Sequence, residues 1–191
     1  MTGRMEAKTK PIGAVRWGIA GLCVAVAACA FVVRPMVASN AAGGLGKRAD
    51  DEITSALRTP QGAARRHALA RAEGLALREL ARSPARSDAW ARLAYARSLA
   101  GGALTPKATQ ALLTSYATAP YDGELMLWRT AFVFGNWSRA SLPLREAAFE
   151  EANAFGRFNV QRKALAKIPP MLDDSSGQFA LMFALEGGPG G

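Results

Sequence analysis

The stretch from residue 83 to residue 102, SPARSDAWARLAYARSLAGG, contains the end of one helix and the whole of the next. Ser83-Pro84 ends the preceding helix, because proline lacks the backbone N–H that a helix needs. Ser87-Asp88 predicts the N-terminal cap of the next helix. Its apolar face follows at helical spacing and consists of Trp90, Leu93, Ala94 and Leu99. The Gly101-Gly102 pair predicts its end.

The same signals divide the rest of the chain into helices. Upstream, leucine and alanine recur at helical spacing as far as Arg82. Downstream, Thr105-Pro106 predicts a capped restart with proline at the first helical position. Further helices are expected from Asp122 to the Gly135-Asn136 stop and from Ser141 to Gly156, with weaker ones near Asp51 and over 158–168. No stretch reads as a strand, so we expect an all-α protein.

The N-terminal region has the features of a membrane span. Residues 17–33 are uncharged, and the stretch extends back to Ile12 with Arg16 near one end. About 20 residues of helix cross a bilayer, so the sequence predicts a transmembrane helix over 12–34. Arg4, Lys8 and Lys10 precede it. This bias predicts a signal anchor in a bacterial inner membrane, with residues 1–11 in the cytoplasm and the C-terminal part in the periplasm.

Two alternatives for this region remain open. Ser39-Asn40-Ala41 is compatible with cleavage of a secretory signal. The tetrapeptide from Val26 to Cys29, VAAC, is similar to a bacterial lipobox, which would make Cys29 a lipidated residue.

The remaining boundaries follow from composition. Residues 35–62 are expected to form a linker with room for a short helix, because they include a small, polar and glycine-containing run. Residues 63–168 are the expected helical domain. Residues 169–191 are expected to be a flexible tail, in which only 179–185 are apolar enough to dock.

The helical part contains one unit that resembles the tetratricopeptide repeat. Pro84 and Pro120 are 36 residues apart, and each lies between two helices. The family's first helix is matched by Trp90, Leu93 and Ala94, and its second by Ala108 and Leu112. The resemblance implies antiparallel helix pairs with a concave binding face, and hence a scaffold for other proteins. A helical bundle with the same spacing by chance is the alternative.

A looser resemblance concerns the process. The segments SPARSDAWARLA (83–94) and APYDGELMLWR (119–129) are similar to parts of small membrane-anchored helical proteins associated with surface-polysaccharide assembly. It implies an adaptor for envelope proteins, serving polysaccharide assembly or export. The candidate partner-binding residues are aromatic or arginine side chains: Trp90, Arg97, Trp128, Arg129 and Trp137. The competing interpretation places Trp128 in the core and Trp137 in a helix turn.

The net charge of +9 suggests a second function. The helix around Arg71, Arg78 and Arg82 is rich in arginine, so these three are candidates for binding an anionic polysaccharide or lipid headgroups. Nucleic acid is not expected outside the cytoplasm.

The sequence does not predict an enzyme, a metal site or a cofactor. His67 is the single histidine and lies in the basic helix, and both cysteines fall in the predicted anchor. Glu146 and Glu150 are one turn apart, a spacing typical of a solvated helix face rather than a catalytic pair.

Overall fold

The computed structural model describes residues 44–187, which contain helices and no strands. The all-α prediction is confirmed for this part of the chain. The α-helices are α2 (Leu45–Arg58), α3 (Ala63–Arg82), α4 (Ser87–Gly101), α5 (Pro106–Thr118), α6 (Met126–Phe134), α7 (Leu142–Gly156), α8 (Asn159–Leu165) and α9 (Ser175–Leu185). Two 3₁₀ turns, η1 (Trp137–Arg139) and η2 (Pro169–Met171), join later helices.

The predicted span over 12–34 lies outside the described residues. Within 44–187, every helix is too short or too polar to cross a bilayer.

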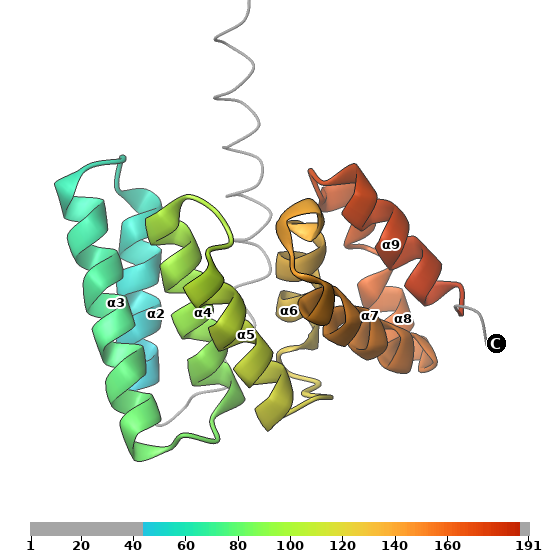
Figure 1. Ribbon diagram of the computed structural model, residues 1–191, viewed down its shortest axis with the longest axis horizontal. Coiled ribbons are helices and arrows are strands. Elements are labelled where there is room, and N and C mark those ends of the chain that lie inside the picture. The colour runs from blue at the N-terminus through green and yellow to red at the C-terminus, as the bar shows by residue number, and fades with distance from the viewer. Residues whose placement is uncertain (1–43, 188–191) are drawn as a thin grey trace, which may run out of the picture.

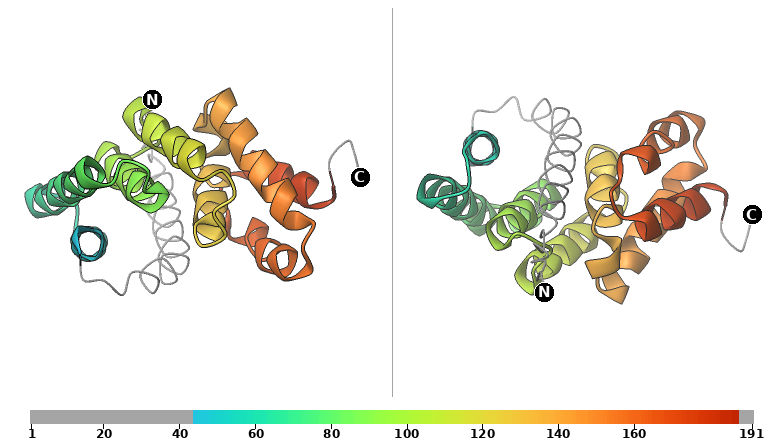
Figure 2. Two further views of the ribbon diagram at one scale, coloured as in Figure 1. Left: turned by 90° about the horizontal axis from the view of Figure 1, so that it is seen from below. Right: turned by 90° about the horizontal axis from the view of Figure 1, so that it is seen from above.

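The helices form two groups that lie side by side (Figure 1). In the first group α2, α3, α4 and α5 run alternately up and down, and each packs on the next. In the second, α7 is the central helix, contacting α6, α8 and α9. Seen from above or below, α2 lies to one side of the row formed by α3, α4 and α5 (Figure 2).

Three of the four predicted ends around α4 are observed. Ser83 is the C-terminal cap of α3, and Gly102 ends α4 in the left-handed conformation (φ 71°) that glycine adopts without strain. The Thr105 hydroxyl caps α5 by accepting a hydrogen bond from Ala108 N at 3.2 Å. The fourth prediction was wrong: Ser87 lies inside α4, and its hydroxyl donates to Asp122 Oδ2 at 2.8 Å instead of capping its own helix.

Helix α4 is buried on nearly all sides, and a charged side chain lies at its centre. The side chain of Arg92 is 1% exposed. Its guanidinium donates to Asp50 of α2 at 2.9 Å, to Glu79 of α3 at 3.2 Å and to Asp88 of α4 at 2.8 Å. Because a buried charge without partners is very costly, this geometry ties three helices to one side chain.

Arg86 completes this network. Its guanidinium contacts Glu79 at 3.2 Å and Asp88 at 2.6 Å. Burial alone would raise the pKa of Asp88, but the hydrogen bonds from Arg86 and the charge of Arg92 lower it to about 2. Burial raises the pKa of Asp50 to about 6, against the opposing effect of Arg92.

Helix α2, of 14 residues, lies within 35–62, where the sequence leaves room for a short helix. This helix begins at Leu45, six residues before the expected start, and packs along α3. Its buried side is made of small residues and Ile53, which made the sequence look like a linker. At Gly46 a Cβ would lie 3.0 Å from Arg92 Nη1, so glycine lets α2 approach the arginine closely.

An aromatic cluster joins the two groups of helices. Tyr95 of α4 packs edge-on against Trp128 and Phe132 of α6, with ring centroids 5.6 and 5.7 Å apart. Trp128 and Phe132 stack on each other at 5.0 Å. Aromatic pairs at these separations are favourable beyond the area that they bury.

The C-terminal segment is also more ordered than its composition suggested. Helix α9 packs on α7 and buries Leu181, Ala184 and Leu185. The Asp174 side chain caps it by accepting from Gly177 N at 3.1 Å. Helix α9 includes 179–185, the part of the tail that the sequence predicts could dock, and it begins earlier, at Ser175.

Removing Arg92 is expected to unfold the first group of helices. In an Arg92→Met variant, Asp50, Glu79 and Asp88 would lose their shared partner, so we expect a loss of about 3–5 kcal/mol in unfolding free energy. Urea titration followed by circular dichroism measures it. Arg71→Met removes an exposed ion pair and is expected to change the midpoint little; equal effects of the two substitutions would contradict the proposed role of Arg92.

Gly177 is expected to be irreplaceable at the α6–α9 contact. A Cβ at this position would lie 1.8 Å from the carbonyl oxygen of Phe134, so Gly177→Ala forces α9 away from α6. We expect a loss of about 1–3 kcal/mol and faster proteolysis of α9. Gly74→Ala is the control, because a Cβ there meets nothing within 4 Å. Unchanged protection of α9 in Gly177→Ala would show that α9 does not dock as described.

Candidate functional site

The three arginines proposed for polyanion binding are exposed on α3. Arg71 forms a two-pronged ion pair with Glu52 of α2, with both N–O distances 2.8 Å. Arg78 and Arg82 make no ion pair with another described residue. They are one helical turn apart, so α3 presents two adjacent cations to solvent.

Trp90 is tied to the turn that follows these cations in the chain. It is half-buried at the start of α4, and its indole Nε1 donates to the carbonyl oxygen of Pro84 at 2.8 Å. Pro84 is exposed and follows Arg82 by two residues. We call the surface formed by Arg78, Arg82, Pro84 and Trp90 the α3–α4 corner. It contains a tryptophan held by a hydrogen bond and two arginines without an ion pair to another described residue.

Arg97 is engaged within the fold. Its Nε donates to Glu73 of α3 at 2.8 Å and its Nη1 to the carbonyl oxygen of Lys107 in α5 at 3.3 Å. It therefore joins three helices while remaining partly exposed.

Two of the predicted partner-binding residues are inaccessible. Trp128 is 3% exposed and Arg129 is fully buried, so neither meets solvent. On α6, Trp128 faces the aromatic cluster and Arg129 faces α7. For Trp128 the competing interpretation, a core residue, is the one that the structure shows.

Arg129 is the centre of a second buried polar cluster. Its guanidinium pairs with Glu151 of α7 and donates to the carbonyl oxygens of Ser115 and Ala119 at 3.2 and 2.9 Å. It also lies 4.4 Å from the centre of the Tyr116 ring. The arginine thus satisfies the last carbonyls of α5 and holds α6 and α7 against them.

Burial shifts the acidic groups of this cluster. It raises the pKa of Glu151 to about 7, although Arg129 opposes the shift. It raises the pKa of Tyr116 as well, and the Glu151 charge adds to that shift. These are structural consequences of a dry interior, since the cluster is closed to solvent.

Trp137 fills the turn between α6 and α7. Its ring stacks on Phe134 at 4.7 Å, and the Arg145 guanidinium lies 5.6 Å from the ring. Arg145 also donates to the Trp137 carbonyl oxygen at 2.9 Å. These contacts hold Trp137, half-buried, away from the α3–α4 corner, so the five aromatic and arginine candidates do not form one site.

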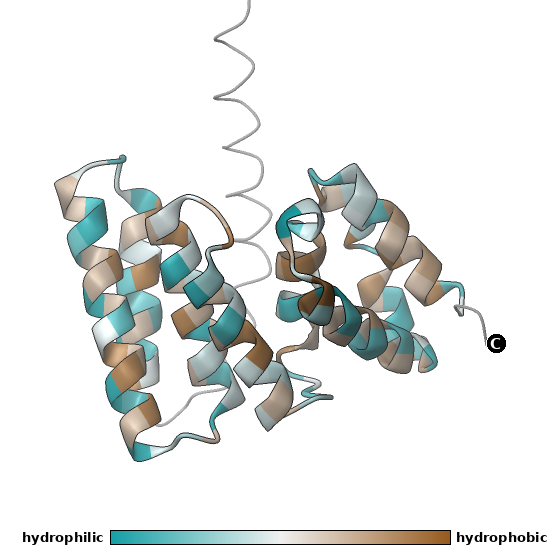
Figure 3. Cartoon of the chain, in the orientation of Figure 1, coloured by the Kyte–Doolittle hydropathy of each residue, from teal (hydrophilic) through white to brown (hydrophobic). Residues whose placement is uncertain are grey.

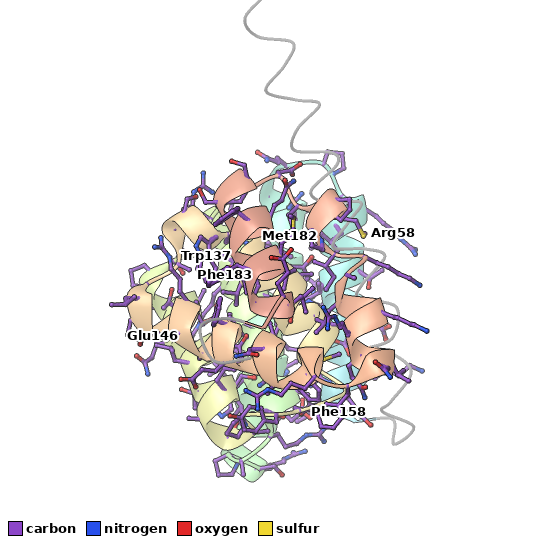
Figure 4. All side chains as sticks on the ribbon, turned by 90° about the vertical axis from the view of Figure 1, so that its right-hand side faces the viewer. Arg58, Trp137, Glu146, Phe158, Met182 and Phe183 are labelled. Carbon is purple, nitrogen blue, oxygen red and sulfur yellow. The ribbon has the colours of Figure 1, made fainter. Side chains whose placement is uncertain are left out.

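Sequence reasoning missed the surface at the other end of the molecule. Large apolar side chains are exposed on α9 and around the start of α8: Phe158 (60%), Val160 (77%), Phe179 (71%), Met182 (48%) and Phe183 (45%). We call these residues, with the exposed cations Arg157, Arg162, Lys163 and Lys167, the α8–α9 end. Figure 4 shows Phe158, Met182 and Phe183 on one side of the molecule.

A signal for this surface was present in the sequence. Over 179–185 the chain reads FALMFAL, so α9 is apolar all round rather than on one side. Figure 3 colours the later part of α9 tan to brown. A docked helix needs one apolar face, and a second one points to another contact.

The residues of catalytic interest lie apart. His67 is exposed on α3, and Glu146 and Glu150 are exposed on α7. Within 44–187, no three side chains of His, Cys, Asp or Glu group as metal ligands would.

No protein-family model, curated protein or solved structure matches this chain.

The Glu151 pKa makes stability depend on pH. Because its pKa is about 7 in the fold and 4.5 ordinarily, the fold binds this proton more tightly than the unfolded chain does. Its contribution is therefore fully present below pH 4.5 and is lost as pH rises to about 7. Glu151→Gln removes this ionisation, so we expect a flatter unfolding free energy across that window.

The measurement is urea unfolding at several pH values. Glu150→Gln, an exposed neighbour on α7, is the control and should keep the slope of the original chain. The Asp50 contribution between pH 3.8 and about 6 remains in all three proteins. A Glu151→Gln slope identical to the control would contradict the assignment.

Proposed function

We propose that this protein is a non-enzymatic adaptor held in a bacterial inner membrane by residues 12–34. Its helical domain would lie in the periplasm and bind another envelope protein. Polysaccharide assembly or export is the process that the sequence resemblance favours. The packing of α2 to α5 as successive antiparallel hairpins supports a tetratricopeptide-like scaffold.

The α3–α4 corner is the observation that carries this proposal. In the first group, Arg71 pairs with Glu52, Arg92 with three acids and Arg97 with Glu73, while other arginines such as Arg58 and Arg66 make no ion pair with a described residue. Arg78 and Arg82 are exposed and likewise make no ion pair with a described residue, and they lie on the helix that leads into the turn to which Trp90 is hydrogen-bonded. Tryptophan and arginine are the residues that most often dominate binding energy at protein interfaces.

The corner is also rigid. It lies on the turn between two long helices, and the Arg92 network fixes those helices beneath it. A rigid surface loses little conformational entropy on binding, which favours affinity.

A polyanion is the second candidate ligand, because the same two arginines are free and exposed. An anionic polysaccharide or a lipid headgroup would contact them as point charges, and binding would weaken steeply with salt. The pairing of Arg71 with Glu52 removes one of the three cations proposed for this function.

The test is photocrosslinking in native membranes with the full chain carrying a photoreactive residue at Ala85, which is exposed in the corner. We expect one envelope protein to crosslink reproducibly, at yields that change little with salt. Arg78→Glu/Arg82→Glu should lower its capture about tenfold, because a hot-spot arginine contributes more than about 1 kcal/mol.

Arg58→Glu/Arg66→Glu is the matched control, with the same charge change at exposed positions outside the corner. It should crosslink as the original chain does. Equal losses in both double variants, or salt-dependent retention of an anionic glycan in place of a protein, would contradict the adaptor and favour the polyanion.

A further inference from the structure

The α8–α9 end combines two properties that rarely coincide on a soluble surface. Its five large apolar side chains are between 45% and 77% exposed. The segment 157–167 beside them contains four cations and no acid. Helix α9 itself contains no charged residue, and two exposed acids flank it, Asp173 before its N-terminus and Glu186 after its C-terminus. Both α8 and α9 pack on α7, which places them at the same end of the molecule.

Of these apolar side chains, Phe183 also packs within the fold, against Phe149 of α7 with ring centroids 6.1 Å apart, while the other four are 48–77% exposed. Helix α9 already buries Leu181, Ala184 and Leu185 against α7, while Phe179 and Met182 stay exposed. Val160 lies in the first turn of α8 and is the most exposed of the set. Apolar residues flanked by cations are the pattern of a surface that enters the interface of an anionic bilayer.

We propose that the α8–α9 end rests on an anionic lipid bilayer, with its phenylalanines in the interfacial region and its cations against the headgroups. The proposal rests on the anchored topology given above. Nine residues separate Arg34 from Gly44, a connection that reaches roughly 30 Å at 3.3–3.6 Å per residue. The anchor would therefore keep the domain close to the lipid, so that even a weak surface contact is populated.

Charge argues against a second copy of the chain as the occupant. In a two-fold dimer this end would face itself, and the cations of 157–167 would meet like charges. A lipid surface with negative headgroups is complementary to the same cations. The adaptor surface then remains free, because the α3–α4 corner belongs to the other group of helices.

The test uses the full chain in vesicles made from equal parts of phosphatidylglycerol and phosphatidylcholine, or from phosphatidylcholine alone. Cys23→Ala and Cys29→Ala remove the native thiols. An environment-sensitive dye is then placed through Ser176→Cys, exposed on the outer face of α9, or through Ala70→Cys, exposed on α3. Spin-labelled lipids quench the dye only when it lies at the membrane.

We expect several-fold stronger quenching at position 176 than at position 70, in anionic vesicles only. The double variants Val160→Ser/Phe179→Ser and Arg162→Glu/Lys163→Glu should abolish that difference. These positions are exposed, so the variants should keep the helix content of the original chain. The matched control Leu77→Ser/Arg66→Glu changes one exposed apolar residue and one exposed cation on α3, and should keep the difference.

Alkaline carbonate extraction of the same vesicles separates this inference from the anchor. Quenching at position 176, with the chain released from the vesicles by carbonate, would contradict the proposed anchor and support the bilayer contact. A chain retained in carbonate without quenching would overturn the contact and keep the anchor. Self-quenching between dyes at position 176, without quenching by lipid, would assign this end to a second copy and also overturn the proposal.

Discussion

A single buried guanidinium organises the first half of this molecule. Arg92 lies at the centre of α4 and bonds to carboxylates of α2, α3 and α4. An apolar side chain at this place would pack without fixing the relative positions of the three helices. The guanidinium of arginine is planar and holds its N–H donors in fixed directions, so hydrogen bonding all of them fixes where the three carboxylates and their helices lie. The position of Trp90, two residues earlier on the same helix, follows from this arrangement, and so does the corner that we propose binds a partner.

The second half of the molecule also has a buried arginine that joins several helices, with different partners. Arg129 bonds to Glu151 and to the last carbonyls of α5, so one side chain connects α5, α6 and α7. The Tyr95–Trp128 contact then joins the halves through α4 and α6. With most of the core made of alanine and leucine, these polar and aromatic contacts specify the arrangement, because small apolar residues allow many alternative packings.

The extent of α3, α4 and α5 was predictable, since proline, glycine and threonine mark their ends directly. The buried arginines were not. In the sequence, Arg92 and Arg129 are surrounded by the same kinds of residue as the exposed arginines of α3. Only long-range partners such as Asp50 and Glu151 distinguish them. The start of α2, residues 45–50, was missed for a related reason, because Gly46 and Ala49 resemble a linker until Arg92 lies against them. Of the proposed binding residues, Trp90, Arg78 and Arg82 remain accessible, and Trp128 and Arg129 are in the core.

Helix α2 is a structural part of the domain, held by Arg92, and it keeps the α3–α4 corner in place. Hydrogen–deuterium exchange of the full chain in lipid nanodiscs measures this. We expect the amides of Leu45–Arg58 to exchange as slowly as those of α3 and α4. Exchange of this segment at the rate of an unstructured linker, while α3 and α4 stay protected, would contradict it.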